Sequence, residues 1–509
     1  MRRLGVRGAA LVLAAASLVA ACSRGGSGSG IGGGNCTVVD VASSPEKVML
    51  LTELAATFNK TKPNGRCVDV RVARKSSGAA AQLLSDGWPD GNGPKPVVWS
   101  PAASSWGAVV NQRLADKGQA AIAPADAKPF MLTPLTIAMP KPMATALGWP
   151  NASLGYSDLA KLATDPNGWA AKGHPEWGPF KLGKTNPNFS TSALSATIAQ
   201  YYAATGKVRD LSLEDVNNPQ VEAAQRAVES AVVHYGDTTL TFLNNLYRAD
   251  ARGTGLTYVS AVAVEEKSVI DYNRGNPDGI LDDGERPRPP RIPLVAIYPK
   301  EGTLFSDNPF FVLDAPWVSA AQREAARAFE SFVLEPRNQR KVLEFGFRPG
   351  NPSVPLADPV TAANGVDPAQ PQTTLGVPSP PVLVKLVEKW GELRKGARVL
   401  LVIDVSGSMG DEAADGQTKL DLAKRAAITA LDQFKSDDLV GLRIFSTGLR
   451  QQQPSDYVDL VPVDRIAVTR EQLVAKINDL VPTNGTPLYT ATGASYDDVK
   501  AAFDPKRIN

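Results

Sequence analysis

Runs of β-branched residues alternate with amphipathic segments along the chain from residue 36. The runs Thr37 to Val41 and Val68 to Val72 are typical of strands. Between them, Ser44-Pro45 opens a helix with four apolar residues on one face: Val48, Leu51, Ala55 and Phe58. Ser76-Ser77-Gly78 then opens an alanine-rich helix before a strand at 96–100. Strands that alternate with helices predict an α/β fold with a parallel sheet.

Hydroxyl side chains gather where the predicted strands end. Ser76 and Ser77 follow one strand, Ser100 ends the next, and Thr191 stands in a polar segment that leads into a helix. In parallel sheets, ligands sit beyond the carboxyl ends of strands, where helix N-termini present free N–H groups. These hydroxyls are therefore candidate ligand-binding groups. The alternative is that each of them only caps a helix.

With this order of elements and these loops, residues 36–350 resemble the bacterial extracellular solute-binding proteins of the type 2 periplasmic class. The resemblance implies two α/β lobes that close on a small solute by a hinge. The residues it places in the cleft are Ser76, Ser77, Ser100 and Thr191, with Tyr258 and Glu265 from a later segment. Uncharged donors suit an oxyanion, whereas a carboxylate at Glu265 would oppose one. The sequence leaves the solute unidentified.

Residues 351–396 are rich in proline and small residues, and they end in a short helix from Val382 to Arg394. We interpret this segment as a linker, because the change in composition marks a domain boundary. The apolar strand Arg398 to Ile403 follows and runs directly into Asp404-Val405-Ser406-Gly407-Ser408. A carboxylate and two hydroxyls at the tip of a parallel strand predict a hard-cation site, since Mg²⁺ accepts oxygen ligands.

The motif DxSxS, present here as DVSGSM, resembles the metal-ion-dependent adhesion site of von Willebrand factor type A domains. The resemblance implies a Rossmann-like α/β fold in which Ser406, Ser408 and Thr486 ligate Mg²⁺ or another divalent cation, with Asp404 binding it directly or through water. A carboxylate from a protein partner would complete the metal's shell. An amphipathic helix, 419–434, and a strand, 439–445, lie between the two loops in the order of the family. The alternative is a chance DxSxS in a turn.

The family carries a further aspartate at the tip of a later strand, and the chain reaches Ile508-Asn509 where that strand should begin. We therefore expect residues 397–509 to form an incomplete domain of this type. An incomplete sheet leaves an unpaired edge, which would weaken the fold and the metal site.

The N-terminal residues show the order of an export signal. Arg2, Arg3 and Arg7 precede an apolar run, 9–21, that is too short for a permanent membrane helix of roughly 20 residues. The run ends in Leu18-Val19-Ala20-Ala21-Cys22, which resembles the lipobox of bacterial lipoproteins. The resemblance implies removal of residues 1–21, lipid on Cys22 and anchoring to the outer face of the cell membrane. Residues 22–35 form a Ser/Gly-rich flexible tether. The alternative is an ordinary signal peptide with a chance cysteine.

Export changes the interpretation of the two remaining cysteines, Cys36 and Cys67. They form an even pair in an oxidising compartment, and each precedes a predicted strand. We therefore predict a disulfide where these two strands begin side by side.

Charge and two local motifs exclude other classes of partner. The formal net charge is only +2 and no basic stripe is present, so we expect no nucleic acid. Residues 178–185 match a phosphate loop letter for letter, but a Pro/Gly loop precedes them and Asn186-Pro187 follows, so we reject nucleotide binding. Residues 276–285 match part of a calcium loop, but Arg274 replaces its first carboxylate. We interpret that segment as an acidic surface turn.

Catalysis has no support in the sequence. His174 and His234 are the only histidines, and the motifs GxSxG, HExxH and CxxC are missing. We expect a non-enzymatic, membrane-anchored binding lipoprotein with a metal-dependent protein-binding module and an unknown protein partner. The alternatives are the receptor component of an ABC importer, and an assembly factor for a metalloenzyme or surface complex.

Overall fold

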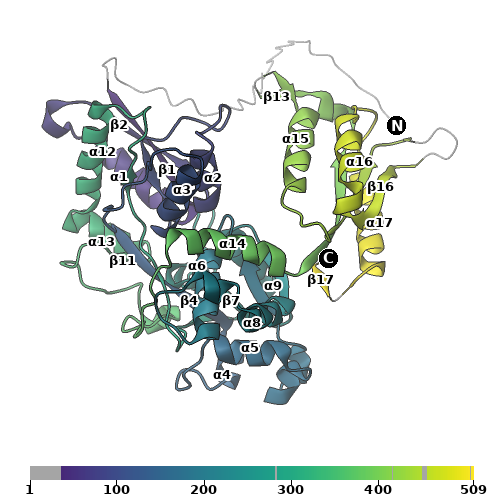
Figure 1. Cartoon of the computed structure of the whole chain (residues 1–509), viewed down its shortest axis with the longest axis horizontal. Helices are drawn as coiled ribbons and strands as arrows, with labels where there is room; N and C mark the ends of the chain where they lie inside the picture. The colour runs from purple at the N-terminus through teal and green to yellow at the C-terminus, as the bar shows by residue number, and fades with distance from the viewer. Residues whose placement is uncertain (1–35, 281–283, 415, 450–454, 505, 509) are drawn as a thin grey trace, which may run out of the picture.

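The computed structural model shows a two-lobed body followed by a separate C-terminal module (Figure 1). It describes residues 36–280, 284–414, 416–449, 455–504 and 506–508. The predicted signal peptide, Cys22 and the tether lie outside these residues. Among the helices that are described, none combines the length and apolarity needed to cross a bilayer.

The first lobe is built on a four-stranded sheet in the order β10-β3-β1-β2. Its strands are β1 (Thr37–Ser43), β2 (Val68–Arg74), β3 (Val98–Ser100) and β10 (Phe311–Val312). Strands β1, β2 and β3 are parallel, as the alternating pattern predicts, and β10 adds an antiparallel edge. The helices of this lobe are α1 (Val48–Phe58), α2 (Ser77–Ser85), α3 (Ser105–Asp116), α12 (Ala320–Val333) and α13 (Pro336–Glu344).

The predicted disulfide is confirmed. Cys36 and Cys67 are bonded, with their Cα atoms 4.5 Å apart, and Thr37 pairs with Val68 one residue later. The bridge therefore joins the amino ends of β1 and β2, and it closes a loop that contains α1.

The second lobe is built on a mixed seven-stranded sheet with the order β11-β4-β7-β5-β6 and with β8 and β9 also paired to β4. Its strands are β4 (Met131–Pro140), β5 (Leu182–Thr185), β6 (Val232–Gly236), β7 (Ala261–Glu265), β8 (Leu294–Ile297), β9 (Phe305–Ser306) and β11 (Arg348–Pro349). Its helices are α4 (Lys141–Ala146), α5 (Tyr156–Thr164), α6 (Thr191–Thr205), α7 (Leu213–Val216), α8 (Pro219–Ser230), α9 (Thr239–Ala251), α10 (Gly255–Tyr258) and α11 (Glu266–Asn273). Strands β5, β6 and β7 are parallel, so their carboxyl ends share one edge.

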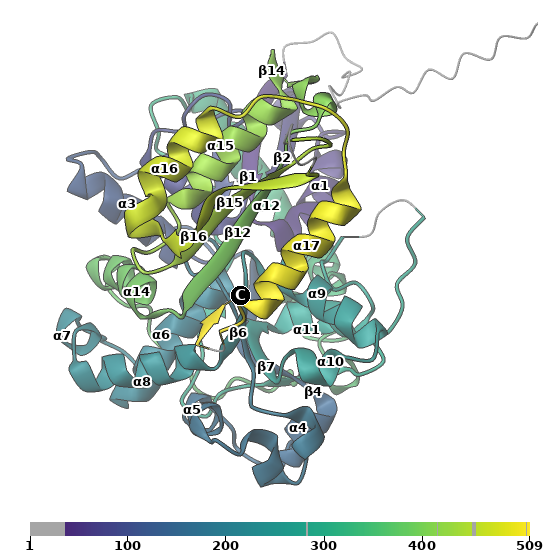
Figure 2. The ribbon, with the colours of Figure 1, turned by 90° about the vertical axis from the view of Figure 1, so that its right-hand side faces the viewer.

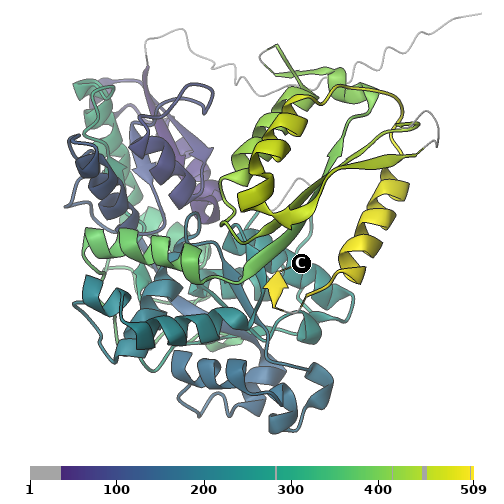
Figure 3. The same ribbon diagram turned by 45° about the vertical axis from the view of Figure 1, so that its right-hand side comes forward.

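The segment interpreted as a linker lies against the body. Val360, Val366 and Leu375 are buried there, and helix α14 (Pro380–Leu393) buries Leu383 and Leu386 completely. The composition predicts a linker, and the apolar residues between its prolines pack against the body. Helix α14 contacts α3 of the first lobe and α6, α7 and α8 of the second, so it lies across both (Figure 3).

The C-terminal module is an α/β domain with the strand order β16-β15-β12-β17. Its strands are β12 (Gly396–Asp404), β15 (Leu439–Phe445), β16 (Tyr457–Arg465) and β17 (Arg507–Ile508), with a small hairpin of β13 (Glu412–Ala414) and β14 (Gln417–Thr418). Its helices are α15 (Lys419–Leu431), α16 (Ile466–Asn478) and α17 (Leu488–Ala501). Strand β12 is parallel to β15 from Arg398 to Asp404, whereas the pairing of β17 in the described part of the chain is with Gly396 and Ala397.

Candidate functional site

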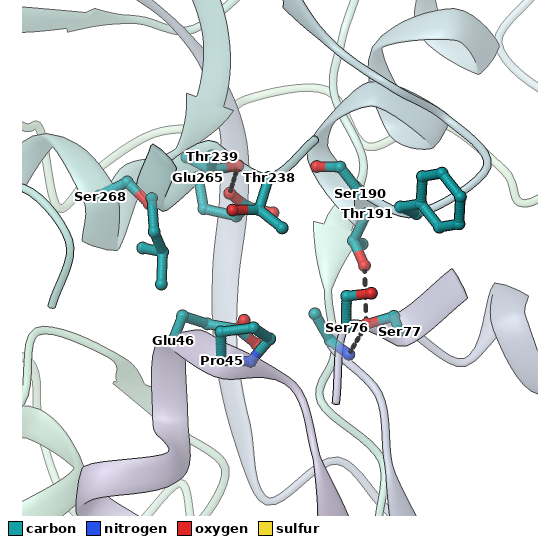
Figure 4. A pocket seen from close by; sticks show the side chains of 13 residues that line it. Pro45, Glu46, Ser76, Ser77, Ser190, Thr191, Thr238, Thr239, Glu265 and Ser268 are labelled. Atoms are coloured by element: carbon teal, nitrogen blue, oxygen red, sulfur yellow. Dashed lines mark hydrogen bonds between the residues drawn. The ribbon is translucent and has the colours of Figure 1, made fainter. Parts of the chain in front are cut away.

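The cleft of the body lies where the carboxyl ends of strands from both lobes meet (Figure 4). Glu46 follows β1, Ser77 follows β2, Thr191 follows β5, Thr239 follows β6, and Glu265 ends β7. Together they line a cavity of about 30 Å³. A volume of this size holds no more than about two water molecules. The lobes are therefore closed on each other.

Four of the residues predicted from the sequence line this cavity: Ser76, Ser77, Thr191 and Glu265. Ser100 lies elsewhere, because its hydroxyl is fully buried and donates to the carbonyl of Pro309 at 3.0 Å. Tyr258 also lies elsewhere, since its ring stacks on His234 with the centroids 4.2 Å apart. Its position in α10 points it to a different cavity, at the module.

Direct hydrogen bonds hold the two lobes together at the cleft. The Thr191 hydroxyl donates to Ser77 Oγ at 3.2 Å and accepts from the indole N–H of Trp106 at 2.8 Å. Beside them, the Gly78 N–H donates to the carbonyl of Phe189 at 3.1 Å. A Cβ on Gly78 would lie 1.9 Å from the Asn188 carbonyl oxygen, so this close approach requires glycine.

Within the second lobe, a chain of hydrogen-bonded hydroxyls ends at the carboxyl group of Glu265. The oxygens of Ser190 and Ser192 are 3.0 Å apart, those of Ser192 and Thr239 are 2.7 Å apart, and Thr239 donates to Glu265 at 3.3 Å. Burial and, to a smaller extent, the nearby Glu46 raise the pKa of Glu265 to about 7. Near neutral pH a substantial fraction of Glu265 is therefore protonated and able to donate a hydrogen bond. Protonation reduces the electrostatic repulsion expected between Glu265 and a bound anion.

The sequence reasoning missed Glu46, Lys47 and Thr239. Lys47 is fully buried below the cleft and donates to Ser44 Oγ, the Pro101 carbonyl and Asn308 Oδ1 at 2.7 to 2.8 Å. Burial lowers the pKa of Lys47 to about 8. The rule of polar residues after strands would have found Glu46 and Thr239, but Ser44-Pro45 predicts only the start of a helix, and the sequence analysis predicts no strand before Thr239, where β6 lies.

The structure also places the residues of the two rejected motifs. Lys184, from the phosphate-loop match, lies buried in strand β5 and forms an ion pair with Glu229, whereas a phosphate loop needs its lysine at the start of a helix. Asp278, from the calcium-loop match, accepts from Asn244 at 2.9 Å, and residues 281–283 lie outside the described chain. His234, one of the two histidines, lies in strand β6.

The DxSxS residues of the module lie at the tip of β12, at the carboxyl edge of its sheet. Asp404 Oδ1 accepts from the Ser406 N–H at 2.7 Å, and the hydroxyl oxygens of Ser406 and Ser408 are 3.4 Å apart. Ser406 is buried, whereas Ser408 is exposed. One carboxylate and two hydroxyls thus form a compact set of oxygen donors that is open to solvent on one side.

The loop that carries Thr486 is tied to this edge. Thr483 N–H donates to the Val405 carbonyl at 2.7 Å, and Gly407 N–H donates to the Asn484 carbonyl at 2.7 Å. The Ser446 hydroxyl, just past the end of β15, donates to the Gly485 carbonyl at 3.0 Å. Three loops therefore converge at the tip of β12, and Thr486 is exposed in one of them. This oxygen-rich edge suits a hard divalent cation.

Comparison with protein families identifies both parts of the chain. The model for bacterial extracellular solute-binding proteins matches residues 39–348. The chain belongs to this family. A model for the von Willebrand factor type A domain matches residues 399–505. The resemblances of residues 36–350 and 397–509 to these two families are confirmed, as is the α/β fold class. Members of the solute-binding family are extracytoplasmic, non-enzymatic binding proteins, which agrees with the expectation of a non-enzyme.

Two curated relatives come from two strains of Mycobacterium tuberculosis, and their names state no activity. Each is 25% identical over 418 residues, which cover 81% of this chain and 56% of the relative. The chain therefore spans about half the length of the curated relatives it matches.

Solved structures of periplasmic binding proteins align with the body. The fructose-6-phosphate-bound protein AfuA of Actinobacillus pleuropneumoniae is 14% identical with a TM-score of 0.46, and covers 70% of this chain and 99% of its own. The sulfate-binding protein SubI of Mycobacterium tuberculosis is 16% identical with a TM-score of 0.41, and covers 70% and 97%.

Proposed function

We propose that this chain is a membrane-anchored extracytoplasmic lipoprotein whose body carries a metal-dependent protein-binding module. The observation that carries the proposal is the convergence of three loops at the tip of β12. Asp404, Ser406 and Ser408 lie on one of these loops, and the loop with Thr486 is bonded to it. The partner is a protein that presents a carboxylate at this edge.

The oxygen donors at this edge fit Mg²⁺ or a related cation. Magnesium takes one or two carboxylates, accepts hydroxyl oxygens and keeps several waters. Asp404, Ser406, Ser408 and Thr486 would hold the ion. When bound, the cation would supply the positive charge that attracts the partner's carboxylate. The three exposed or half-exposed donors leave that side of the site open to a partner.

The family of the body supports an extracytoplasmic location. Helix α14 argues against the alternative function, the receptor component of an ABC importer. An importer receptor opens and closes its lobes to load and release solute. Here α14 contacts both lobes, and Lys389 on it pairs with Glu222 of the second lobe at 2.6 Å. Tyr235 of the second lobe packs its ring on Trp390, with centroids 5.7 Å apart. These contacts oppose hinge opening and favour a body that serves as a platform.

The anchor at Cys22 rests on the signal sequence that precedes it. Lipid on Cys22 would keep the body at the membrane surface, with residues 22–35 as the tether. In cells that produce the chain, wild type is expected in the membrane fraction and Cys22→Ser in the soluble exported fraction. An equal membrane content of both chains would contradict lipid anchoring.

Metal-dependent capture of envelope proteins tests the module. The intact chain is expected to retain a partner in Mg²⁺, to release it in EDTA, and to lose it with Asp404→Ala. Asp464→Ala is the matched control, because Asp464 is exposed and pairs with Val440 at the amino end of β15, opposite the site. If Asp404→Ala retains the same proteins as wild type, the adhesion-site function is wrong.

A further inference from the structure

A second cavity lies where the module meets the body. Its volume is about 660 Å³, within the range of roughly 300–1,000 Å³ that is typical of small-molecule sites. Residues of β6 and α10 line it from the body, and residues of α17 line it from the module. Figure 2 shows the C-terminal end of α17 beside β6. We call this space the interdomain cavity.

Aromatic rings form much of the wall of the interdomain cavity. On the body side, His234 and Tyr258 are stacked with their planes 16° apart, and Phe180 is buried next to them. On the module side, Tyr496 and Phe503 are 63% and 65% exposed. These two rings border the cavity without being buried against the body, so they leave apolar surface for a flat ligand.

The charged residues in the wall are basic. Lys181, Lys395, Lys500 and Arg507 line the cavity, and none of the described residues that line it is acidic. Lys181 donates to the carbonyl of Thr257 at 2.5 Å, and Lys395 donates to the carbonyl of Val232 at 3.3 Å. Asp504 lies 3.8 Å from Arg507 but outside the lining. The ammonium groups of Lys181 and Lys395 are thus partly buried against neutral acceptors.

This arrangement places an excess of positive charge in a partly dry place, and Asp504, outside the lining, offsets part of the charge of Lys395 and Arg507. Burial lowers the pKa of both Lys181 and Lys395, because removing the charged ammonium groups from water is unfavourable. An anion between them would offset that cost with charge-assisted hydrogen bonds.

The two walls are held in a defined relation by the junction between α14 and β12. Arg394, at the end of α14, forms an ion pair with the fully buried Asp438 of the module. Asp438 also accepts from the backbone N–H groups of Ala397 at 2.7 Å and Lys435 at 2.9 Å. Since α14 packs on both lobes, this junction ties the start of the module to the body.

We infer that the interdomain cavity binds an amphipathic anion, a compound that joins a flat aromatic group to a sulfonate, carboxylate or phosphate. The aromatic group lies against His234 and Tyr258, and the anionic group is held by Lys181 and Lys395. A ligand that contacts both body and module stabilises their arrangement. This binding is separate from the metal site at the tip of β12.

Anilinonaphthalene sulfonate is a suitable probe for the full-length chain, because it joins flat rings to a sulfonate and fluoresces when removed from water. Saturable binding is expected, and the double variant Lys181→Glu/Lys395→Glu should weaken it by about tenfold or more. The control Lys128→Glu/Lys172→Glu makes the same charge change at exposed lysines outside the cavity, and should bind as wild type does.

The module's part is tested with Phe503→Ser, a change at an exposed ring that leaves the core intact. It should also weaken probe binding, with the thermal unfolding temperature unchanged. Equal affinity of wild type and the Lys181/Lys395 variant would overturn the site, as would equal binding of the uncharged phenylnaphthylamine. Unchanged affinity in Phe503→Ser would overturn the interdomain placement. The assay uses neither metal nor protein partner, so its outcome is independent of the proposed function.

Discussion

At the scale of single residues, Glu265 shows how the fold sets the chemistry of the cleft. Its carboxyl is buried, accepts a hydrogen bond from Thr239, and lies near a second carboxylate, that of Glu46. Burial and the neighbouring charge both favour the protonated form. The sequence identified Glu265 through a family resemblance, but its protonation depends on neighbours that are distant in the chain.

The raised pKa of Glu265 predicts a loss of stability as the pH rises. Between the unfolded pKa of 4.5 and the folded value of about 7, the unfolded chain loses a proton that the folded chain keeps. Relative to wild type, Glu265→Gln should therefore gain up to about 3 kcal/mol of stability between pH 5 and pH 8. Thermal unfolding at both pH values measures this.

The exposed Glu214→Gln is the control, and it should follow wild type at both pH values. A Glu265→Gln chain whose stability relative to wild type is the same at pH 5 and pH 8 would show that Glu265 is ionised in the folded cleft.

Single residues also show how much of the candidate site could be predicted from the sequence. Ser76, Ser77 and Thr191 were found because polar residues after parallel strands converge on one edge. Ser100 follows the same pattern but turns into the lobe, toward Pro309, which is 209 residues away in the chain. Direct bonding of Ser77 to Thr191, across 114 residues, depends on lobe closure and has no local signal.

At the scale of elements, the sequence predicted helix α14 but not its packing against both lobes. The helix itself was predicted almost to the residue, at 382–394 against Pro380–Leu393. Its partners were not, because an amphipathic pattern shows that one face is buried without showing what covers it. The structure supplies the partners, α3 in one lobe and α6 to α8 in the other.

The contacts of α14 predict that weakening it frees the lobes. Leu386 is fully buried, so Leu386→Ala should cost about 2–5 kcal/mol and widen the distance distribution between fluorophores placed on the two lobes. Lys385→Ala is the control, since its surface ion pair with Glu388 contributes at most about 1 kcal/mol. A folded Leu386→Ala chain with the distances of wild type would show that α14 does not hold the lobes.

At the scale of the whole molecule, a solute-binding body and a von Willebrand factor type A module share one short junction. The strand tip that delivers Asp404 was predictable, because an apolar strand that ends in DxSxS is a local pattern. The Arg394–Asp438 pair that joins module and body was not, because it depends on how the two parts of the chain meet. The position of the module relative to the body therefore could not be predicted from the sequence.

The central claim is that the module of this chain holds a divalent cation at the tip of β12, and binding of Mn²⁺ to the full-length chain tests it most directly. Electron paramagnetic resonance of free Mn²⁺ counts the bound ions. Wild type and Asp464→Ala are expected to bind the ion at one common site, and Asp404→Ala is expected to lose that site. Equal Mn²⁺ binding by Asp404→Ala and wild type would contradict the account.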